Sequence, residues 1–401
     1  MVKTKGDALR RGVGLTREEL GHVFGLSGIF ALRLLGLFLV LPVLSIYAKD
    51  LRGATPFLAG LAVGLYGLAQ MCLQLPFGLL SDRFGRKPMI AVGLAIYAGG
   101  SVVAALSTSI WGLMLGRFIQ GSGAISSVVL ALIADLTREE VRGRAMAVVG
   151  ISIGVSFTLG FVLGPLLSAR YGTPFLFWLV ACLDSLAIAY LMLRVPNPPP
   201  RQASAGFTTG LSVVMKDRNL SALNATMFLL HMGLTAVWVV TPSLLLEHWA
   251  RKDMWHVYLP MILLAGGIML PAMGLAEAKQ RLRTLLAAGM AVAAVGMLVL
   301  GLSPGAPQLT AIGLVIFFVG FNLMEPVLPS LVSRFAPAER RGGAMGMFNM
   351  SQFFGAFVGG ATGGYFLGHG RFGLYWTLLA LCVPWAWAAS RLEAPPARNV
   401  H

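Results

Sequence analysis

The sequence predicts an all-α polytopic membrane protein, with twelve transmembrane helices arranged as two pseudo-symmetric six-helix bundles. The composition carries this prediction first: 57% of the 401 residues are hydrophobic and only 12% are charged. Soluble domains usually carry about 25% charged residues, and the mean hydropathy here is +0.77. The second observation is length, because a helical span needs about 20 apolar residues and the chain has room for about a dozen. The segments are too long and too uniformly apolar for barrel strands.

The apolar segments follow one another with short polar turns between them. In the first half they cover about 23–47, 57–80, 88–107, 110–134, 144–168 and 174–194. In the second half they cover about 220–246, 256–276, 284–303, 308–333, 343–368 and 372–391. The longest internal polar segment opens with the prolines of 196–200, which stop a helix and stiffen the chain. We therefore expect an N-terminal bundle over 1–195, a cytoplasmic linker over 196–219 and a C-terminal bundle over 220–401.

The charges predict how the chain lies in its membrane. Most of the 31 Lys and Arg residues fall on one side when both termini are placed in the cytoplasm, as the positive-inside rule requires. The cations sit in short loops rather than on one face, so a nucleic-acid partner is not expected. Cys72, Cys182 and Cys382 lie inside apolar segments and read as small apolar residues rather than a disulfide or metal site. These features favour a multi-pass protein of a bacterial inner (plasma) membrane.

The two halves of the chain are related by a shift of 199 residues, which carries Glu140 onto Glu339. Each matched set opens with a charged turn and runs into a glycine-rich span. The other pairs are Arg142 and Arg341, Gly143 and Gly342, Ala145 and Ala344, Met146 and Met345, Ser152 and Ser351, Gly160 and Gly359, and Gly164 and Gly363. Duplicated six-helix halves are typical of secondary transporters, whose substrate site lies between the halves near the bilayer midplane.

Three motifs give the chain a family resemblance. The turn after the second span, Gly78-x-x-x-Asp82-Arg83-x-Gly85-Arg86-Lys87, resembles the signature loop of the major facilitator superfamily. The run from Arg117 through Gln120 to Gly123 resembles that family's RxxQG motif. The fifth span resembles the glycine-rich motif of twelve-span drug:proton antiporters, through Gly150, Gly154, Gly160, Gly164 and Pro165. The first span from Leu32 to Leu44, and the run from Phe321 to Glu325, are similar to the YajR-like group of efflux proteins.

The resemblance implies a role for the charged loop and for the glycines. A conformational latch would consist of Gly78, Asp82, Arg83, Gly85, Arg86 and Asp135. Asp82 would meet the start of the eleventh span near Gly342, where the helix dipole favours negative charge, and Arg86 would pair with Asp135. Both contacts are expected only while the cytoplasmic side is closed. The alternative is that the loop's cations serve topology alone. The motif glycines and Pro165 are expected to serve helix packing, and a specific role in antiport is the alternative.

The resemblance also places spans one, four, seven and ten around a central cavity. Candidate cavity residues on these helices and on the second span are Arg33, Gln70, Gln74, Gln120, Asn224 and Asn322. Gln70 and Gln74 could instead simply bond neighbouring helices. Candidate proton-coupling residues are Glu325, Arg117 and His231. Glu325 lies well inside its span, where burial favours the neutral form of a carboxyl group and suits a proton carrier. It could instead be a structural partner of Arg33, and His231 could be a satisfied interior histidine. Asp184 is interpreted as a local hydrogen-bonding residue or a group near the membrane interface.

These features favour a secondary active transporter that exports small amphipathic compounds or drugs in exchange for protons, by alternating access. A proton symporter or uniporter for a sugar or organic anion is the alternative, and a non-transporting receptor or scaffold is less favoured. Protons would be the coupling ion, with no cofactor and no metal. The expected partners are a small-molecule substrate and the lipid bilayer, and the expected working unit is a monomer. The chain lacks the sequence motifs of common enzyme classes, so an enzyme is not expected.

Overall fold

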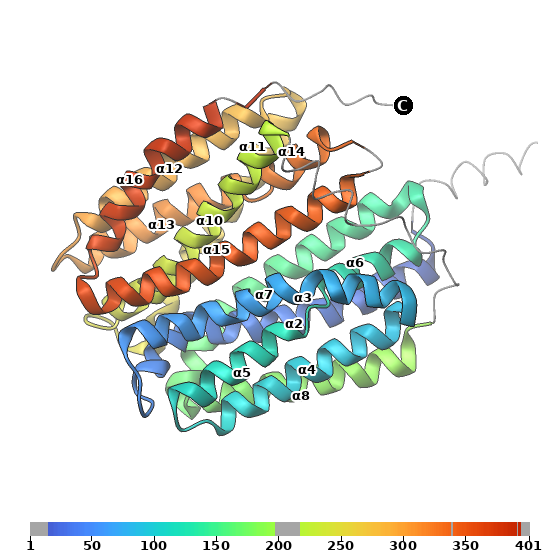
Figure 1. The fold of residues 1–401 in the computed structure, drawn as a ribbon, viewed down its shortest axis with the longest axis horizontal. Helices are drawn as coiled ribbons and strands as arrows, with labels where there is room; N and C mark the ends of the chain where they lie inside the picture. The colour runs from blue at the N-terminus through green and yellow to red at the C-terminus, as the bar shows by residue number, and fades with distance from the viewer. Residues whose placement is uncertain (1–14, 197–216, 338–339, 391, 394–401) are drawn as a thin grey trace, which may run out of the picture.

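The computed structural model describes residues 15–196, 217–337, 340–390 and 392–393, and helices dominate it (Figure 1). The predicted linker over 196–219 lies almost entirely outside these residues, as do residues 1–14 of the predicted N-terminal bundle. The helices of the first half are α2 (Arg17–Lys49), α3 (Pro56–Phe84), α4 (Arg86–Leu106), α5 (Ile110–Ser122), α6 (Ser126–Asp135), α7 (Arg142–Tyr171) and α8 (Thr173–Arg194). Those of the second half are α10 (Arg218–Leu245), α11 (Trp255–Ala278), α12 (Leu282–Gly301), α13 (Pro307–Met324), α14 (Val327–Phe335), α15 (Arg341–His369) and α16 (Gly373–Ser390).

The helices match the predicted spans closely. Within the described residues, 10 helices are long and apolar enough to cross a membrane, when α5 with α6 and α13 with α14 are each counted as one. The glycine-rich α15 and the C-terminal α16 complete the twelve. The predicted all-α fold with twelve transmembrane helices is therefore confirmed.

Helix starts follow from local sequence. Thr16 caps α2 in a reciprocal capping box with Glu19, and Thr55 caps α3 directly before Pro56 at the first helical position. Gly85 separates α3 from α4 at φ +94°, a conformation that L side chains rarely adopt. The charged turn between the second and third spans therefore depends on this glycine.

Two predicted spans are broken in the middle. The fourth span stops at Ser122 and resumes at Ser126, and the tenth stops at Met324 and resumes at Val327. The breaks occupy the same place in the internal repeat, because the shift of 199 residues carries Ser126 onto Glu325. Pro326 has no backbone N–H to continue the helix. Irregular backbone at membrane depth is tolerated where it is buried in protein or lines a cavity, so both breaks mark places of interest.

The described helices of each half lie together, and the seam between the halves runs along α3 and α15 (Figure 1). Small residues allow this approach: a methyl group on Gly64 would lie 2.6 Å from the carbonyl oxygen of Phe357, and one on Gly67 would lie 2.7 Å from that of Phe353. Gly60 meets Gly364 in the same seam. The other face of α15 packs its glycines against α10.

The seam closes at one end of the molecule only. We call the end that carries the basic turns, with the start of α2 and the start of α10, the basic end. Toward the basic end, a methyl group on Gly78 would meet only Ser127 of its own half, and one on Gly342 would meet nothing within 4 Å. In Figure 1, α3 and α15 diverge toward this end. Helices α3 and α15 therefore separate toward the basic end.

Aromatic side chains join the halves toward the end where α3 and α15 converge. The rings of Phe157 on α7 and Phe318 on α13 stack with centroids 5.4 Å apart, and Phe161 packs edge-on against Trp238 at 4.6 Å. Further toward the opposite end, Arg251 donates a hydrogen bond of 3.4 Å to Ser168. These contacts hold the two halves together toward the end opposite the basic end.

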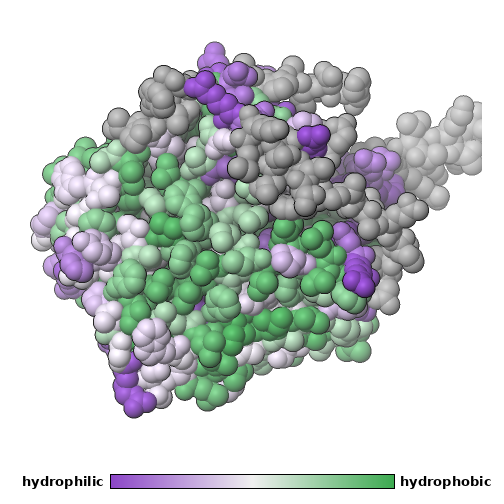
Figure 2. Space-filling model, viewed as in Figure 1, coloured by the Kyte–Doolittle hydropathy of each residue, from purple (hydrophilic) through white to green (hydrophobic). Residues whose placement is uncertain are grey.

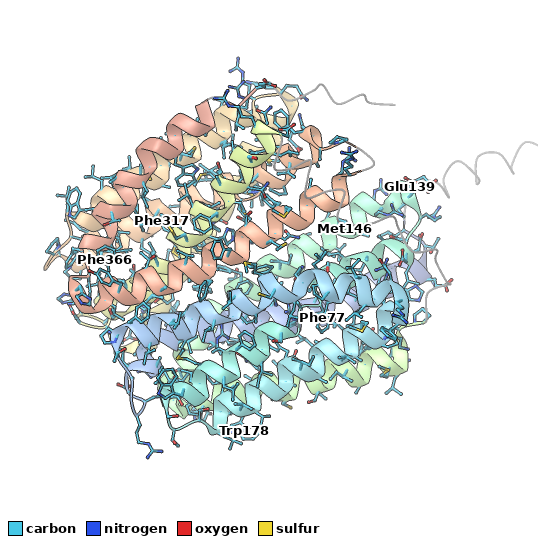
Figure 3. The ribbon with its side chains drawn as sticks, viewed as in Figure 1. Phe77, Glu139, Met146, Trp178, Phe317 and Phe366 are labelled. Atoms are coloured by element: carbon cyan, nitrogen blue, oxygen red, sulfur yellow. The ribbon has the colours of Figure 1, made fainter. Side chains whose placement is uncertain are left out.

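The outer surface fits a lipid environment. Figure 2 shows hydrophobic residues across the broad middle of the visible face and hydrophilic residues toward its margins. In Figure 3, Glu139 marks the basic end of the N-terminal half, whereas Trp178 lies toward the other end. Apolar side chains such as Leu193 and Leu270 are exposed on this surface, which suits contact with acyl chains.

Candidate functional site

The carboxylate of Glu325 occupies the break between α13 and α14. Its side chain is 35% exposed, yet its Oε2 atom is shielded and has no hydrogen-bond partner within the described part of the chain. That oxygen lies 3.9 Å from Nε2 of His231 on α10. Glu325 thus combines partial exposure with a nearby imidazole, which makes it able to bind and release a proton.

His231 is held on two further sides. Its Nε2 atom lies 2.8 Å from Nε2 of Gln352 on α15, and its ring packs edge-on against Phe321 at 5.5 Å. Directly before Gln352 on α15, Ser351 donates a hydrogen bond of 3.3 Å to the amide oxygen of Asn224 on α10. We call Asn224, His231, Glu325, Ser351 and Gln352 the C-terminal polar site.

Asn322 stays close to its own helix. Its Nδ2 atom donates a 2.8 Å hydrogen bond to the carbonyl oxygen of Phe318 one turn back. The side chain is partly buried. Asn322 therefore lies close to the break between α13 and α14, but its side-chain amide donates a hydrogen bond within α13.

Arg33 is enclosed within the N-terminal half. It is 1% exposed, and its guanidinium donates to Ser126 Oγ at 3.2 Å, to Tyr66 Oη at 3.2 Å and to the carbonyl oxygen of Gly123 at 2.9 Å. The last contact matters because Gly123 lies in the break between α5 and α6. The guanidinium also lies 5.3 Å from the centroid of the Tyr97 ring. Arg33, on α2, thus donates a hydrogen bond to the backbone at the break between α5 and α6.

A second arginine lies in the same cluster. Arg117 donates a 2.7 Å hydrogen bond to Gln120, whose Nε2 atom donates to Ser101 at the same distance. The guanidinium of Arg117 lies 4.9 Å from the centroid of the Tyr66 ring, and Gln70 donates to Tyr66 Oη at 2.9 Å. These groups form one buried network on α3, α4 and α5.

Asp184 supplies the carboxylate of this network. The side chain is 0% exposed and interacts electrostatically with Arg33. Both of its oxygens lack a hydrogen-bond donor among the described residues. The expectation of a local hydrogen-bonding role is therefore not met, and Asp184 instead balances buried positive charge from α8.

The structure corrects the predicted substrate cavity. Arg33, Gln70 and Gln120 are each 1% exposed or less and are bonded within the N-terminal half, so they do not line the space between the halves. Gln74 is 6% exposed and is also buried. The physical reason is that buried amides and guanidinium groups need partners. Their own bundle supplies most of them, although Oε1 of Gln70 and Oε1 of Gln74 have no partner among the described residues.

Two pairings with Glu325 that were considered from the sequence, those of Arg33 and Arg117, are not made in the structure. Arg33 bonds within its own half, so it is not the structural partner of Glu325. Arg117 contacts Gln120 and Tyr66 there, whereas the neighbour of Glu325 is His231. Of the residues assigned to proton coupling, the structure brings only Glu325 and His231 together.

The charged loop is present as a network within one half. Arg86 bonds Asp135 with Nε and Oδ2 at 2.5 Å, and its Nη2 atom lies 3.2 Å from Asp82 Oδ1. Lys87 donates to the carbonyl oxygens of Val195 and Met192 at the end of α8. The guanidinium of Arg83 lies over the neighbouring Phe84 ring.

The predicted pairing of Arg86 with Asp135 is made, and it joins α4 to α6 inside the N-terminal half. Its expected dependence on a closed cytoplasmic side stays a prediction. Asp82 is paired with Arg86, and open space surrounds Gly342, so the expected meeting of Asp82 with α15 is not made in this state.

The motif glycines of α7 divide into two pairs. A methyl group on Gly160 would lie 2.8 Å from the backbone of Phe38, and Gly164 meets the backbone of Leu39, with Pro165 buried beside it. Gly150 and Gly154 have nothing within 4 Å. The packing role predicted for all four is therefore made by Gly160 and Gly164 only, and it joins α7 to α2 within one half.

Three participants were missed from the sequence. Tyr66 and Tyr97 hold the arginines, and Gln352 holds His231. A signal existed for each, because a tyrosine or glutamine in the middle of an apolar span needs a partner. Their partners lie on other helices, so spacing within one helix could not identify them.

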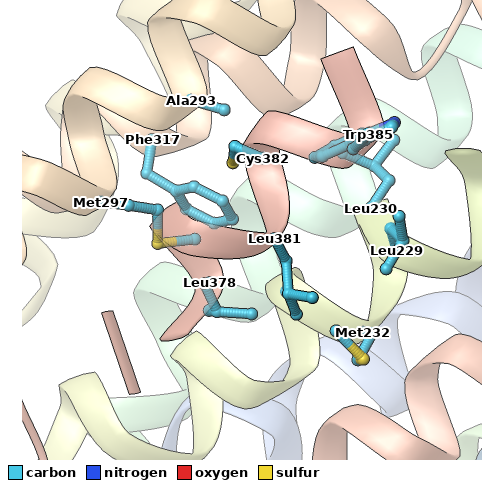
Figure 4. Close-up of a pocket in the computed structure, with 11 residues that line it drawn as sticks. Leu229, Leu230, Met232, Ala293, Met297, Phe317, Leu378, Leu381, Cys382 and Trp385 are labelled. Carbon is cyan, nitrogen blue, oxygen red and sulfur yellow. The ribbon is translucent and has the colours of Figure 1, made fainter. Parts of the chain in front are cut away.

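An apolar pocket lies inside the C-terminal half, lined in part by residues of α10 on either side of His231 (Figure 4). Helices α10, α12, α13 and α16 line it through residues that include Met232, Met297, Phe317, Leu381 and Trp385. It offers no convergent polar groups, so we do not assign the transport site to it.

Comparisons with known proteins agree with this architecture. The profile of the Major Facilitator Superfamily matches residues 26–360 and 223–400. The inner membrane transport protein YajR of Escherichia coli (strain K12) is 41% identical over 95% of this chain and 85% of its own length. The multidrug resistance protein MdtH of Klebsiella pneumoniae (strain 342) is 28% identical over 84% of each chain.

Among solved structures, a bacterial homologue of the human lysosomal transporter Spinster, in an inward-facing and occupied conformation, has a TM-score of 0.79. The similarity covers 96% of this chain and 100% of that one at 14% identity. The nucleoside transporter NupG has a TM-score of 0.73 at 15% identity, over 94% of this chain and 99% of that one. These two likenesses concern the fold.

Proposed function

The chain belongs to the Major Facilitator Superfamily of secondary transporters, and from that premise we propose that it exports small amphipathic compounds in exchange for protons. The single observation that carries the proposal is the position of Glu325. A partly exposed carboxylate lies at a mid-span helix break, 3.9 Å from an imidazole. A membrane-embedded carboxylate of this kind suits a proton carrier.

We place the protein in the bacterial inner membrane with its basic end in the cytoplasm. The support is the excess of Lys and Arg at that end, and the similarity to an inner membrane transport protein. In this orientation α3 and α15 separate toward the cytoplasm. Substrate and protons would then alternate at the C-terminal polar site as residues 1–195 and 220–401 rock about the α3–α15 seam.

The buried charges bear on the class of substrate. Arg33 and Arg117 would be the anchors for an organic anion, but both are 1% exposed and bonded within their own half. The partly exposed ionisable group at this level is Glu325, and Phe321 and Phe318 stack beside it. A carboxylate beside aromatic rings favours an amphipathic compound that is neutral or cationic. This argues for the exporter over symport of an organic anion.

The charged loop would act as the latch of the closed cytoplasmic side. Because Arg86 and Asp135 are already paired, the part that changes between states is Asp82, which would leave Arg86 for the start of α15. The helix N-terminus there favours a carboxylate. Arg86 and Asp135 then serve as the fixed base of the latch.

The test is transport by purified protein in liposomes with an imposed pH gradient. Glu325→Gln should bind an amphipathic cation but lose most of the acceleration that the gradient gives to the wild type. Glu277→Gln, at the end of α11, is the matched control and should respond like the wild type. Full coupling in Glu325→Gln would remove Glu325 from the proton path. No gradient response in the wild type would refute proton exchange itself.

A further inference from the structure

Gln352 lies where the C-terminal polar site meets the seam between the halves. Its side chain reaches His231 on α10, while the next residue, Phe353, presents its carbonyl oxygen to Gly67 on α3. Gly67 is the seam glycine nearest the basic end for which the contact with α15 is made. One residue of α15 therefore faces the proton site, and its neighbour faces the other half of the protein.

The chemistry of the contact defines which group donates. Two nitrogens 2.8 Å apart form a hydrogen bond only if one has a free lone pair. With the amide nitrogen of Gln352 facing the ring, as the structure has it, Gln352 donates and Nε2 of His231 accepts, because an amide nitrogen does not accept. The imidazole is then neutral, with its hydrogen on Nδ1. The same Nε2 is the atom nearest to Glu325, at 3.9 Å.

The lone pair on Nε2 of His231 can therefore accept from either of two donors, the amide of Gln352 or a protonated Glu325. A proton that loads onto Glu325 can be shared with His231 only if the O–H of Glu325 approaches Nε2, and Gln352 must then give up its bond. If the proton passes to the imidazole, Nε2 becomes a donor and the amide of Gln352 must turn its oxygen toward it or leave. Either route changes the link between α10 and α15.

Among the residues that the structure describes, Glu325 is the charged group placed to interact with His231. Of the helices packed on α10, α2 brings Arg33, which is turned to Tyr66 within the N-terminal half. α16 brings Tyr375, which bonds Thr241 far along α10 from His231. The charged residues of α3, α14 and α15 lie near the ends of those helices. Glu325 is the titratable neighbour at 3.9 Å.

We propose that Gln352 is a positioning residue that competes with Glu325 for Nε2 of His231, so that proton loading breaks or reverses the hydrogen bond that joins α10 to α15 at the end of the α3–α15 seam. The inference rests on the proposed function, because it takes Glu325 to be the proton carrier. It adds the step by which a proton bound in the C-terminal half changes a hydrogen bond beside the seam between the two halves.

The test is the pH dependence of the conformational equilibrium in purified, substrate-free protein, followed by the distance between spin labels on the basic ends of the two halves. Gln352→Met keeps the size of the side chain and removes the donor. The freed lone pair should favour the protonated site, so the pH midpoint should rise by about one unit, the value of one hydrogen bond. Asn349→Met, one turn earlier on α15, is the control and should keep the wild-type midpoint.

A second measurement does not depend on a variant of Gln352. In protein with ¹⁵N-labelled histidine, assigned with His231→Gln, the wild type at high pH should show His231 with its hydrogen on Nδ1 and Nε2 as an acceptor. A hydrogen on Nε2, or an unchanged midpoint in folded Gln352→Met, would overturn the role of Gln352. The role of Glu325 would survive that result as long as Glu325→Gln abolishes the pH response, so the two proposals fail separately.

Discussion

Gly64→Ala should shift the conformational equilibrium rather than unfold the protein. A methyl group at this position would lie 2.6 Å from the carbonyl oxygen of Phe357 and 3.3 Å from the Cα atom of Gly360. These are backbone atoms of α15, so they cannot rotate away as a flexible side chain would. They also belong to the other half, so the halves can relieve the clash by separating at this seam. The state in which α3 and α15 separate toward the basic end is therefore the one that loses stability.

The size of the shift follows from the cost of overpacking. Inserting a methyl group into a well-packed contact costs about 1–3 kcal/mol. Because about 1.4 kcal/mol is a factor of ten in an equilibrium constant, the ratio of the two states should change by roughly 5- to 150-fold. The state closed at the basic end should gain that population, because its seam at Gly64 is free to open.

The assay is the distance between labels at each end of the molecule, measured without substrate. Gly64→Ala should lengthen the distance across the end opposite the basic end and shorten the one across the basic end. Gly266→Ala on α11, where nothing lies within 4 Å, is the matched control for adding a methyl group to a glycine in a helix. If the two variants show the same distances, the seam does not hold the halves in this state and the reasoning is refuted.

Three further outcomes follow from the buried networks. Arg33→Met should lower the free energy of unfolding by about 3 kcal/mol, because Gly123 and Asp184 lose a charged partner. Thermal unfolding in detergent measures this loss without a transport assay. Retained stability would mean that water replaces the guanidinium. Arg86→Ala and Asp135→Ala should each slow transport, with a double variant no worse than either one, and additive losses would separate the pair. Gly160→Leu should abolish folding or expression, since backbone of α2 fills the space, whereas Gly154→Leu should be tolerated; equal effects would contradict the division of the motif.

The fold was largely readable from the sequence, as particular segments illustrate. The runs of apolar residues predicted the spans, and the prolines at 196–200 predicted the end of the sixth helix, which the structure places at Arg194. These are local properties, because a span must satisfy its own backbone and a proline acts on its own helix. The two mid-span breaks were not foreseen, although Pro326 and the glycines at Gly121 and Gly123 stand at them.

The candidate site was only partly readable. Glu325 stood out because a carboxylate deep in an apolar span is costly and needs a reason. The assignment of Arg33 and Gln120 to the cavity came from a resemblance about helices, which cannot say which side of a helix faces inward. Burial and partners on α3 and α4 decided that these side chains serve their own half.

By itself, the sequence determined the membrane-spanning class, the duplicated halves and the carboxylate that could carry a proton. Each of these depends on the identity of residues along one segment, or on a repeat visible in the letters. Only the tertiary structure decided that Arg86 and Asp135 pair inside one half, that Gln352 reaches His231, and that α3 and α15 pack together toward one end and separate toward the other. The physical reason is that a transport path lies between helices. Its lining, partners and gates depend on how helix faces turn toward one another, which no single segment encodes.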